Sequence, residues 1–301
     1  MTPCKDDKDL VCVSTTDFFY PLIEDPYKQG EIACCNVLSD LYSMGITNVD
    51  NILMILGVSL LMKENEREIV TREMMSGFNN KAKEAGTTIT GGQSVMNPWP
   101  MIGGTAISVV KRTEVIFPNN AKEGDLLLLT KPLGTQPAVN LAQWLIESDN
   151  KWLKAKEHVT EENVWDSLQI AENSMTRLNL NGAKIMKKYR IGCCTDVTGF
   201  GLRGHAENLL IAQKKELKFL INKLPIIKNM DIINDSVLNF KLKLGYSAET
   251  SGGLLISIDR NDAEKFMKEM HDLNEWCWVI GEVREGKREF ELSDKIEYIY
   301  V

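Results

Sequence analysis

The sequence lacks any apolar run long enough to cross a membrane. A membrane-spanning helix needs about 20 consecutive, mostly apolar residues, and charged or polar residues interrupt every apolar stretch of this 301-residue chain before that length. The first residues, MTPCKDDKDL, also lack the apolar segment of a secretory signal peptide. The sequence therefore predicts a cytoplasmic protein with no membrane partner.

An excess of positive charge is missing too. The chain has 35 Lys and Arg residues against 42 Asp and Glu residues, which gives a formal net charge of -7. This balance argues against nucleic acid as a partner. An anionic ligand must then be held by local groups, such as glycine amides, helix N-termini or metal ions.

Residues that ligate metals or act as nucleophiles are sparse. Three histidines are too few for a His-based metal cluster, and the seven cysteines form no C-x-x-C pair. No His or Lys accompanies a cysteine in the pattern of an activated nucleophile. The phosphate-binding motif G-x-x-x-x-G-K-[ST], the kinase signatures and G-x-S-x-G are also absent. We therefore expect reduced, buried thiols in a reducing compartment.

What is present is an alternation of strand-like and helix-like segments. The strand-like runs are rich in β-branched or apolar residues, and the helix-like segments carry apolar residues at helical spacing. In the first part of the chain, the expected strands are residues 10–16, 51–60, 87–90 and 101–110, and the expected helices are residues 27–44 and 63–85. Two strand–helix–strand units of this kind predict an α/β or α+β domain.

A change of composition at residues 112–124, around Pro118, marks the expected domain boundary. We expect an N-terminal domain over residues 1–113 and a C-terminal α/β domain over residues 114–301. Both lengths suit single domains of about 100 to 200 residues. The expected strands of the second domain are residues 125–130, 192–195, 216–221, 251–258 and 276–283.

Two aspartates, Asp17 and Asp40, are the first candidate site residues. Asp17 ends a strand, where α/β folds commonly place ligand-contacting side chains, although a turn or a helix cap is the alternative. Asp40 lies inside the following helix between Leu38 and Leu41, so we expect a partly buried carboxylate that needs a partner. With Asp17 nearby, Mg²⁺ is the natural partner, because it prefers oxygen ligands and leaves positions for water and phosphates.

A third aspartate, Asp196, ends a short strand and precedes VTGFGLRGHA. Gly199, Gly201 and Gly204 allow close backbone approach, and a helix beginning there offers free amides to a phosphate. The G-x-G-x-x-G spacing is a weak signal alone, because no acidic residue follows about 20 residues later as in dinucleotide-binding folds. Tight helix packing is the structural alternative.

The sequence GGQS at residues 91–94 interrupts a strand pattern. Two interpretations stay open: a bulge or hairpin turn, or a cradle of backbone amides for phosphate. The sequence ETSGG at residues 249–253 permits the same two, and there we favour a structural role. Lys131 and Thr135 flank another strand-to-helix turn, where contact with an anion competes with a solvated lysine.

Six blocks, in chain order, resemble the selenophosphate synthetases, particularly the eukaryotic form: STTDFFYP, NVLSDLYSMG, TGGQSVMNPW, LTKPLGTQ, TDVTGFGLRGHA and ETSGGLL. The resemblance covers essentially the whole chain. It implies the two-domain fold shared with aminoimidazole ribonucleotide synthetase, thiamine monophosphate kinase and the hydrogenase-maturation ATPases. It also implies a homodimer in which the sheets of the N-terminal domains pair.

The resemblance further implies an activity and a site. The family converts ATP, selenide and water into selenophosphate, AMP and phosphate, with Mg²⁺ between carboxylates and phosphates. The implied metal ligands are Asp17, Asp40 and Asp196, and the implied ATP-binding residues are Asp17, Asp40, Gly91, Gly92, Gln93 and Ser94. In the family, the loop that matches residues 91–94 can act across the dimer interface. Clustered metals suit phosphoryl transfer, which depends mainly on positioning and charge neutralisation.

The sequence also departs from the family pattern. The family carries a reactive Cys or selenocysteine, an essential Lys and a further metal-binding Asp ahead of the first strand, and this sequence begins at Met1, after all three. Cys4 lies too close to STTD to be that nucleophile, and Lys5 lies in a turn, so neither role is assigned to them. We therefore expect a shortened form that folds and dimerises but makes little or no selenophosphate. The alternatives are a non-catalytic regulatory paralogue, or another ATP-dependent kinase or synthetase of the same superfamily.

Overall fold

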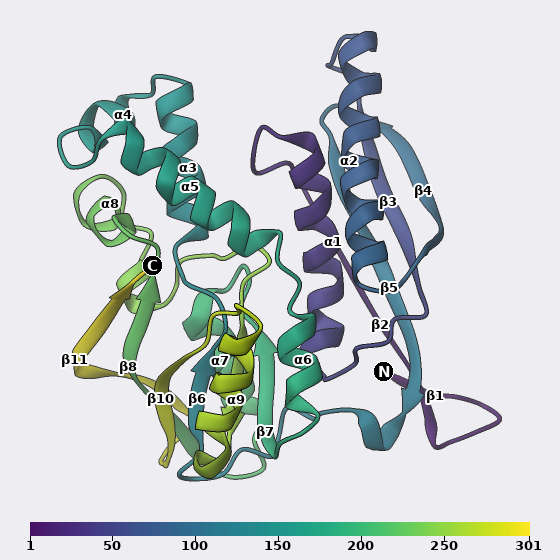
Figure 1. Cartoon of the computed structure of the whole chain (residues 1–301), viewed down its shortest axis with the longest axis vertical. Helices are drawn as coiled ribbons and strands as arrows, with labels where there is room; N and C mark the ends of the chain where they lie inside the picture. The colour runs from purple at the N-terminus through teal and green to yellow at the C-terminus, as the bar shows by residue number, and fades with distance from the viewer. The chain divides into compact units, whose positions relative to one another are not determined.

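The structure, a computed structural model, describes all residues from Met1 to Val301 and divides into two units (Figure 1). The first unit comprises residues 1–115 and 176–183, and the second comprises residues 116–175 and 184–301. The return of residues 176–183 to the first unit was not expected from the sequence. None of the helices has the length and apolar character that crossing a bilayer requires.

The first unit contains a five-stranded sheet in the order β1-β2-β5-β3-β4. Only β3 and β4 pair in parallel, and the other neighbours are antiparallel. The strands are β1 (Thr2–Pro3), β2 (Leu10–Phe19), β3 (Asn51–Ser59), β4 (Ile89–Asn97) and β5 (Met101–Lys111), and a 3-10 turn, η1 (Arg112–Glu114), follows them. β4 is therefore an edge strand, bonded on one side only.

Two helices, α1 (Pro26–Ser43) and α2 (Glu64–Glu84), pack against each other, and α1 also contacts β2 and β5 (Figure 1). Asp25 caps α1, because its carboxylate accepts hydrogen bonds from the amides of Tyr27 and Lys28 at 2.9 and 3.1 Å. Gly45, at φ 72°, adopts the left-handed conformation that commonly ends a helix. These local signals explain why the sequence predicted α1 to within one residue at each end.

Glycines let α1 and α2 approach closely. A Cβ atom on Gly30 would lie 2.0 Å from the carbonyl oxygen of Met74, and one on Gly77 would lie 1.9 Å from that of Tyr27. Real side chains do not fit at these distances, so the two glycines fix where the helices cross.

The other face of this sheet has no helix over it. Along β2, Val11 and Val13 are buried, whereas Ser14, Thr16 and Phe18 on the opposite face are exposed. The uncovered face includes large apolar side chains, with Phe18 53% and Val95 46% exposed. A partly apolar sheet face beside an open edge is suited to contact with another protein surface.

The second unit is built on a six-stranded sheet in the order β11-β8-β10-β6-β9-β7. Its neighbours are antiparallel except for the parallel pair β8 and β11. The strands are β6 (Leu126–Leu129), β7 (Ile191–Asp196), β8 (Leu217–Ile226), β9 (Leu254–Ile258), β10 (Trp278–Glu285) and β11 (Glu289–Tyr300). Strands and helices alternate in both units around mixed sheets, as expected for an α/β (α+β) chain.

The remaining elements connect these strands. The helices are α3 (Thr135–Ile146), α4 (Asn150–Ala155), α5 (Glu161–Met175), α6 (Leu180–Met186), α7 (Gly201–Ala212), α8 (Met230–Ser236) and α9 (Arg260–Asp272), with a 3-10 turn, η2 (Leu242–Leu244). Residues 289–300 were not predicted as a strand, because their polar and apolar residues follow no strict alternation. They form β11 by pairing with β8.

The expected break at residues 91 and 92 was wrong. β4 runs through both glycines, and an irregularity in its pairing with β3 places Ile52 opposite Ile89 but Leu53 opposite Gly91. One extra residue, Thr90, therefore forms a bulge in β4. Gly92 follows at φ 143°, where an added Cβ would lie 1.9 Å from the carbonyl oxygen of Met54. The glycines thus allow a close strand pairing that a side chain would prevent.

Candidate functional site

Asp17 and Asp40 come together where β2 meets α1. The hydroxyl of Thr15, on β2, donates a hydrogen bond of 2.5 Å to Oδ2 of Asp40, on α1. Burial, and then the negative charge of Asp40, raises the pKa of Asp17 to about 6. The sequence expectation that a strand and the next helix would juxtapose these carboxylates agrees with this arrangement.

One detail of that expectation was wrong. Asp40 is exposed rather than partly buried, although Leu38 and Leu41 on either side are buried. The reason is the pitch of the helix, since residues one position apart point in directions about 100° apart. Near the end of α1, this leaves Asp40 open to solvent while its neighbours pack inward. An open carboxylate can reach a ligand without rearrangement of the core.

The pair has the chemistry of a partial cation site. A half-buried Asp17 held near a second carboxylate keeps its proton more tightly than usual, and a bound cation would remove the repulsion between the two groups. No group of three or more His, Cys, Asp or Glu side chains is gathered in one place anywhere in the chain. If Asp17 and Asp40 bind Mg²⁺, most coordination positions of the ion would therefore be left to water, phosphate oxygens or further carboxylates.

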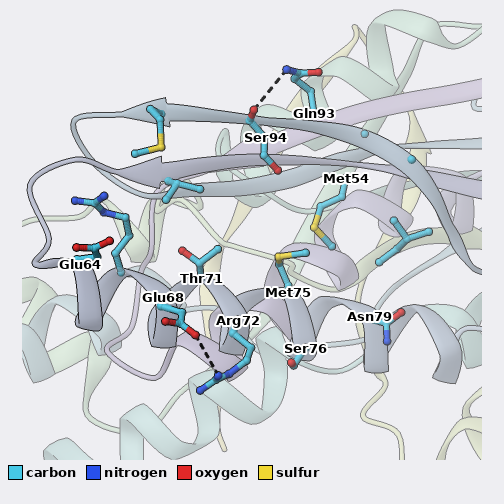
Figure 2. Close-up of a pocket in the computed structure, with 16 residues that line it drawn as sticks. Met54, Glu64, Glu68, Thr71, Arg72, Met75, Ser76, Asn79, Gln93 and Ser94 are labelled. Atoms are coloured by element: carbon cyan, nitrogen blue, oxygen red, sulfur yellow. Dashed lines mark hydrogen bonds and ion pairs between the residues drawn. The ribbon is translucent and has the colours of Figure 1, made fainter.

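Residues 91–94 lie on β4 and line a cavity of about 1000 Å³ beneath α2. Figure 2 shows Ser94 directed toward this cavity and Gln93 directed away from α2, with the Gln93 amide 3.4 Å from the Ser94 carbonyl oxygen. The apolar lining consists of Met54, Val58, Met75, Ile89 and Met96, and the polar lining includes Glu64, Arg67, Glu68, Thr71, Arg72, Ser76 and Asn79. The lining therefore combines apolar side chains, mostly from the sheet, with polar and charged side chains, mostly from α2.

The carboxylates and this cavity occupy the same face of the sheet but different places on it. Asp17 is opposite Gly104, Gly104 is opposite Met54, and Met54 is opposite Gly92. Three strand spacings of about 4.8 Å separate β2 from β4, or roughly 14 Å. Phe78 of α2 is fully buried over the middle of this row, with its Cζ 3.4 Å from a Cβ built on Gly104. Within one chain, packed side chains thus separate the two features.

Asp196 ends β7 in the second unit and is buried. The amide of Thr198, two residues later, donates a hydrogen bond of 3.0 Å to Nε2 of His205, so this nitrogen is unprotonated. His205 therefore holds the loop after Asp196. The structure places Asp196 within its own sheet, beside Leu254 of β9.

Three further polar residues, Lys131, Thr135 and Glu249, lie at this end of the second sheet. Lys131 is only 2% exposed, and its ammonium donates a hydrogen bond of 2.7 Å to the carbonyl oxygen of Ser251. It is not the solvated lysine that a helix start suggests. Glu249 is buried as well, and its carboxylate accepts hydrogen bonds from Thr135. The available signal was that LTKPLGT follows one strand while ETSGG precedes its antiparallel neighbour.

Comparison with protein families gives two matches that together cover most of the chain. Residues 4–110 match the AIR synthase related protein, N-terminal domain, and residues 122–292 match the AIR synthase related protein, C-terminal domain. The expected two-domain fold is confirmed by these matches.

Curated relatives at high identity share one description. The chain is 49% identical to selenide, water dikinase 2 of Mus musculus, covering 97% of this chain and 65% of that protein. It is 48% identical to selenide, water dikinase 2 of Homo sapiens, covering 97% of this chain and 66% of that protein. It is 47% identical to selenide, water dikinase of Dictyostelium discoideum, covering 97% of this chain and 80% of that protein. The chain thus spans slightly less than two thirds of the mouse and human proteins.

Solved structures share the fold at low identity. Thiamine-monophosphate kinase from Stenotrophomonas maltophilia has a TM-score of 0.71 at 15% identity, covering 95% of this chain and 86% of that one. AaThiL complexed with AMPPCP and TMP has a TM-score of 0.68 at 16% identity, covering 95% of this chain and 84% of that one. Hydrogenase maturation protein HypE in complex with ATP has a TM-score of 0.68 at 14% identity, covering 91% of this chain and 77% of that one.

Proposed function

The chain belongs to the selenide, water dikinase family, and from this membership we propose that it is an ATP-dependent phosphotransferase that makes selenophosphate. The proposed reaction consumes ATP, selenide and water and releases AMP and phosphate. Its main structural support is the pair of carboxylates, Asp17 and Asp40: burial, and then the negative charge of Asp40, raises the pKa of Asp17 to about 6. Such a pair is suited to a cation that accompanies a nucleotide.

We propose that Asp17 and Asp40 bind Mg²⁺ and that Asp196, in the second unit, is a further metal ligand. When bound, the metal would neutralise charge on the phosphates. Thr15 orients Asp40 by donating to its Oδ2, which leaves Oδ1 to face a ligand. Asp17 must lose its proton to act as a ligand, so its raised pKa makes metal binding dependent on pH.

We propose that Gly91, Gly92, Gln93 and Ser94 contact the nucleotide of a partner chain in a homodimer. The support is the separation of roughly 14 Å between β2 and β4, at about 4.8 Å per strand, filled by the packed Phe78. The uncovered sheet face with Phe18 and Val95, beside the open edge of β4, would meet the partner. In this proposal the domain of residues 1–113 binds ATP and forms the dimer.

A cytoplasmic location is part of the proposal. All seven cysteines are free, and five of them are buried, which fits a reducing compartment. We also expect no nucleic-acid or membrane partner, since the net charge is -7.

The experiment is to measure nucleotide binding and turnover together. Calorimetry should detect binding of ATP that requires Mg²⁺, and AMP release should require selenide. AMP release without dependence on selenide would contradict the proposed substrate. Phosphate release in response to thiamine monophosphate would favour another kinase of the same fold, and binding of ATP without turnover would favour a regulatory paralogue.

A further inference from the structure

Glu249 is a buried carboxylate to which the proposed function gives no role. It lies in the loop before β9 and is 3% exposed. One oxygen, Oε1, accepts a hydrogen bond of 2.7 Å from the amide of Gly134. The other, Oε2, accepts one of 2.9 Å from the amide of Thr135 and another from the Thr135 hydroxyl. All these donors belong to the N-terminus of α3.

A helix start does not by itself require a residue so distant in the sequence. An Asp, Asn, Ser or Thr at the capping position would satisfy the first amides locally. That position of α3 is Gly134, at φ 108°, which has no side chain to do so. Burying a carboxylate is unfavourable unless its hydrogen bonds are satisfied, and burial raises the pKa of Glu249 to about 7 even with three donors. Glu249 thus caps α3 from a distant loop. The contacts of that loop show which other residues this attachment holds in place.

That loop is bonded directly to the segment after Asp196. The amide of Glu249 donates to the carbonyl oxygen of Thr198 at 3.0 Å, and the amide of Val197 donates to that of Gly253 at 2.9 Å. A Cβ on Gly252 would lie 2.1 Å from the Val197 carbonyl oxygen, so the two backbones are in close contact. Residues 249–253 thus brace residues 196–198.

The same loop also contacts the turn before α3 on its other side. Lys131 donates to the carbonyl oxygen of Ser251 at 2.7 Å, and a Cβ on Gly253 would lie 2.4 Å from the Lys131 amide nitrogen. The loop therefore lies between the Asp196 segment and the turn of residues 131–135. Glu249 attaches this loop to the N-terminus of α3 by hydrogen bonds.

We propose that Glu249 is a positioning residue for Asp196: by holding residues 249–253 to the N-terminus of α3, it fixes the backbone that carries the aspartate. The functional consequence rests on the proposed role of Asp196 as a ligand of Mg²⁺. The structural consequence does not, because it concerns only hydrogen bonds within the second unit. The two are therefore tested by separate measurements.

The first test is hydrogen exchange in Glu249→Gln. The Gln side chain has an NH₂ group in place of one carboxylate oxygen. This group cannot accept a hydrogen bond, so a buried N–H group at the start of α3 loses its acceptor. Exchange at the amides of Gly134, Thr135 and Val197 should accelerate by about tenfold or more, since local opening becomes easier. Unchanged exchange at Val197 would overturn the proposal.

Asp125 provides a matched control, because it is another buried carboxylate of this unit, 2% exposed, and lies at the opposite end of β6. It accepts hydrogen bonds from the amide of Lys122 and the hydroxyl of Ser257, and it pairs with Arg190. Asp125→Asn should lower stability without selective acceleration at Val197. Equal acceleration in both variants would mean general loosening and would also overturn the proposal.

The second test measures Mn²⁺ binding, by the loss of the free Mn²⁺ signal in electron paramagnetic resonance, in the presence of AMPPCP. Glu249→Gln should weaken binding about tenfold while Asp125→Asn leaves it unchanged, the range expected when support for a metal ligand is lost. If the unaltered chain binds no Mn²⁺ with AMPPCP, the proposed function fails, and the exchange measurement still decides the positioning role. If exchange accelerates but Mn²⁺ binding is unaltered, Glu249 does not position a metal ligand.

A milder variant guards against loss of folding. Thr135→Val keeps both backbone donors and the charge of Glu249 but removes the hydroxyl. It should give the same pattern of faster exchange, at Thr135 and Val197, with a smaller amplitude. Acceleration limited to Thr135 would show that the attachment does not reach the Asp196 segment and would contradict the proposal.

Discussion

Asp17 and Gly92 lie in one row of the first sheet, three strands apart, with Gly104 and Met54 between them. The row is on the face that α1 and α2 cover, where Phe78 fills the interval. A ligand bound at Asp17 therefore cannot follow the sheet surface to Gly92 of the same chain without displacing the core. This separation is the basis for the proposal that the two residues contact one nucleotide from two chains.

Replacing Asp40 should impair nucleotide binding without unfolding the chain. Asp40→Asn removes a charge at an exposed position, so affinity for Mg-ATP should fall by about tenfold or more, equivalent to about 1.4 kcal/mol. Calorimetry measures the affinity, and circular dichroism checks the fold. Asp50→Asn is the control, since Asp50 is also exposed and its carboxylate accepts a hydrogen bond of 2.7 Å from the amide of Val109. Equal losses in both variants would argue against a metal-binding role for Asp40.

A mixture of two defective variants should recover binding if the site is shared. Asp40→Asn removes a carboxylate, and Ser94→Trp fills the cavity into which Ser94 points (Figure 2). Each homodimer should bind poorly, but random mixing should restore one intact site in each mixed dimer, about a quarter of all sites. Calorimetry after unfolding and refolding the mixture measures the recovered sites. No recovery from two folded variants that each bind poorly would mean that both features act within one chain, which would contradict a shared site.

The metal-free chain should show an unusual titration at Asp17. Its pKa is raised from 3.8 to about 6, first by burial and then by Asp40, so Asp40→Asn should lower it. Because the folded state holds this proton more tightly than the unfolded state, the stability from Asp17 is present below pH about 4 and is lost as pH rises through about 6. Carbon-13 NMR of the carboxyl group follows the titration. A pKa near 4 in the metal-free chain would contradict the expectation.

Gly91 and Gly92 should differ sharply in their tolerance of alanine. At Gly92 a Cβ would lie 1.9 Å from the Met54 carbonyl oxygen, whereas at Gly91 the nearest atom is Leu53 Cδ2 at 3.5 Å, an ordinary contact. Gly92→Ala should therefore lower the free energy of unfolding by more than about 2 kcal/mol, and Gly91→Ala by less than about 1 kcal/mol. Urea denaturation of both variants gives the comparison. Similar losses would mean that β4 readily changes its register.

A charge on the uncovered face should weaken self-association. Val95 is 46% exposed on edge strand β4, so Val95→Lys should shift a dimer to monomer by placing a charge in an apolar contact. Light scattering coupled to size exclusion measures the mass. Ile211→Lys, at a 71% exposed position on α7 of the second unit, should leave the mass unchanged. A monomer for the unaltered chain, or a dimer for Val95→Lys, would count against the proposed interface.

Local signals account for the parts of the fold that the sequence predicted well. α1 was predicted at residues 27–44 and spans Pro26–Ser43, because Asp25 and Gly45 define its ends chemically. The closeness of Asp17 and Asp40 followed from a strand joined to the next helix. The bulge in β4 was one of two interpretations left open for residues 91–94.

Features that depend on distant partners could not be predicted in this way. Lys131 is buried because its acceptor is Ser251, and Glu249 caps a helix that begins at Thr135. Each partner lies more than 100 residues away in the sequence, and only the pairing of β6 with β9 brings the two segments together. β11 likewise exists because β8 offers an edge, since its own pattern of polar and apolar residues is irregular. Long-range packing therefore decided these elements over local preference.

Residues 176–183 have a consequence for how the chain is made. They belong to the first unit. There the carbonyl oxygen of Thr176 accepts a hydrogen bond from Sγ of Cys35 at 3.1 Å, and the side-chain amide of Asn179 donates one to the Ser39 hydroxyl at 2.9 Å. A ribosome adds roughly 5–20 residues per second, so α1 exists for several seconds before these partners are synthesised. Residues 116–175 emerge during that interval. The first unit therefore completes its core only after residues 116–175 of the second unit have been translated.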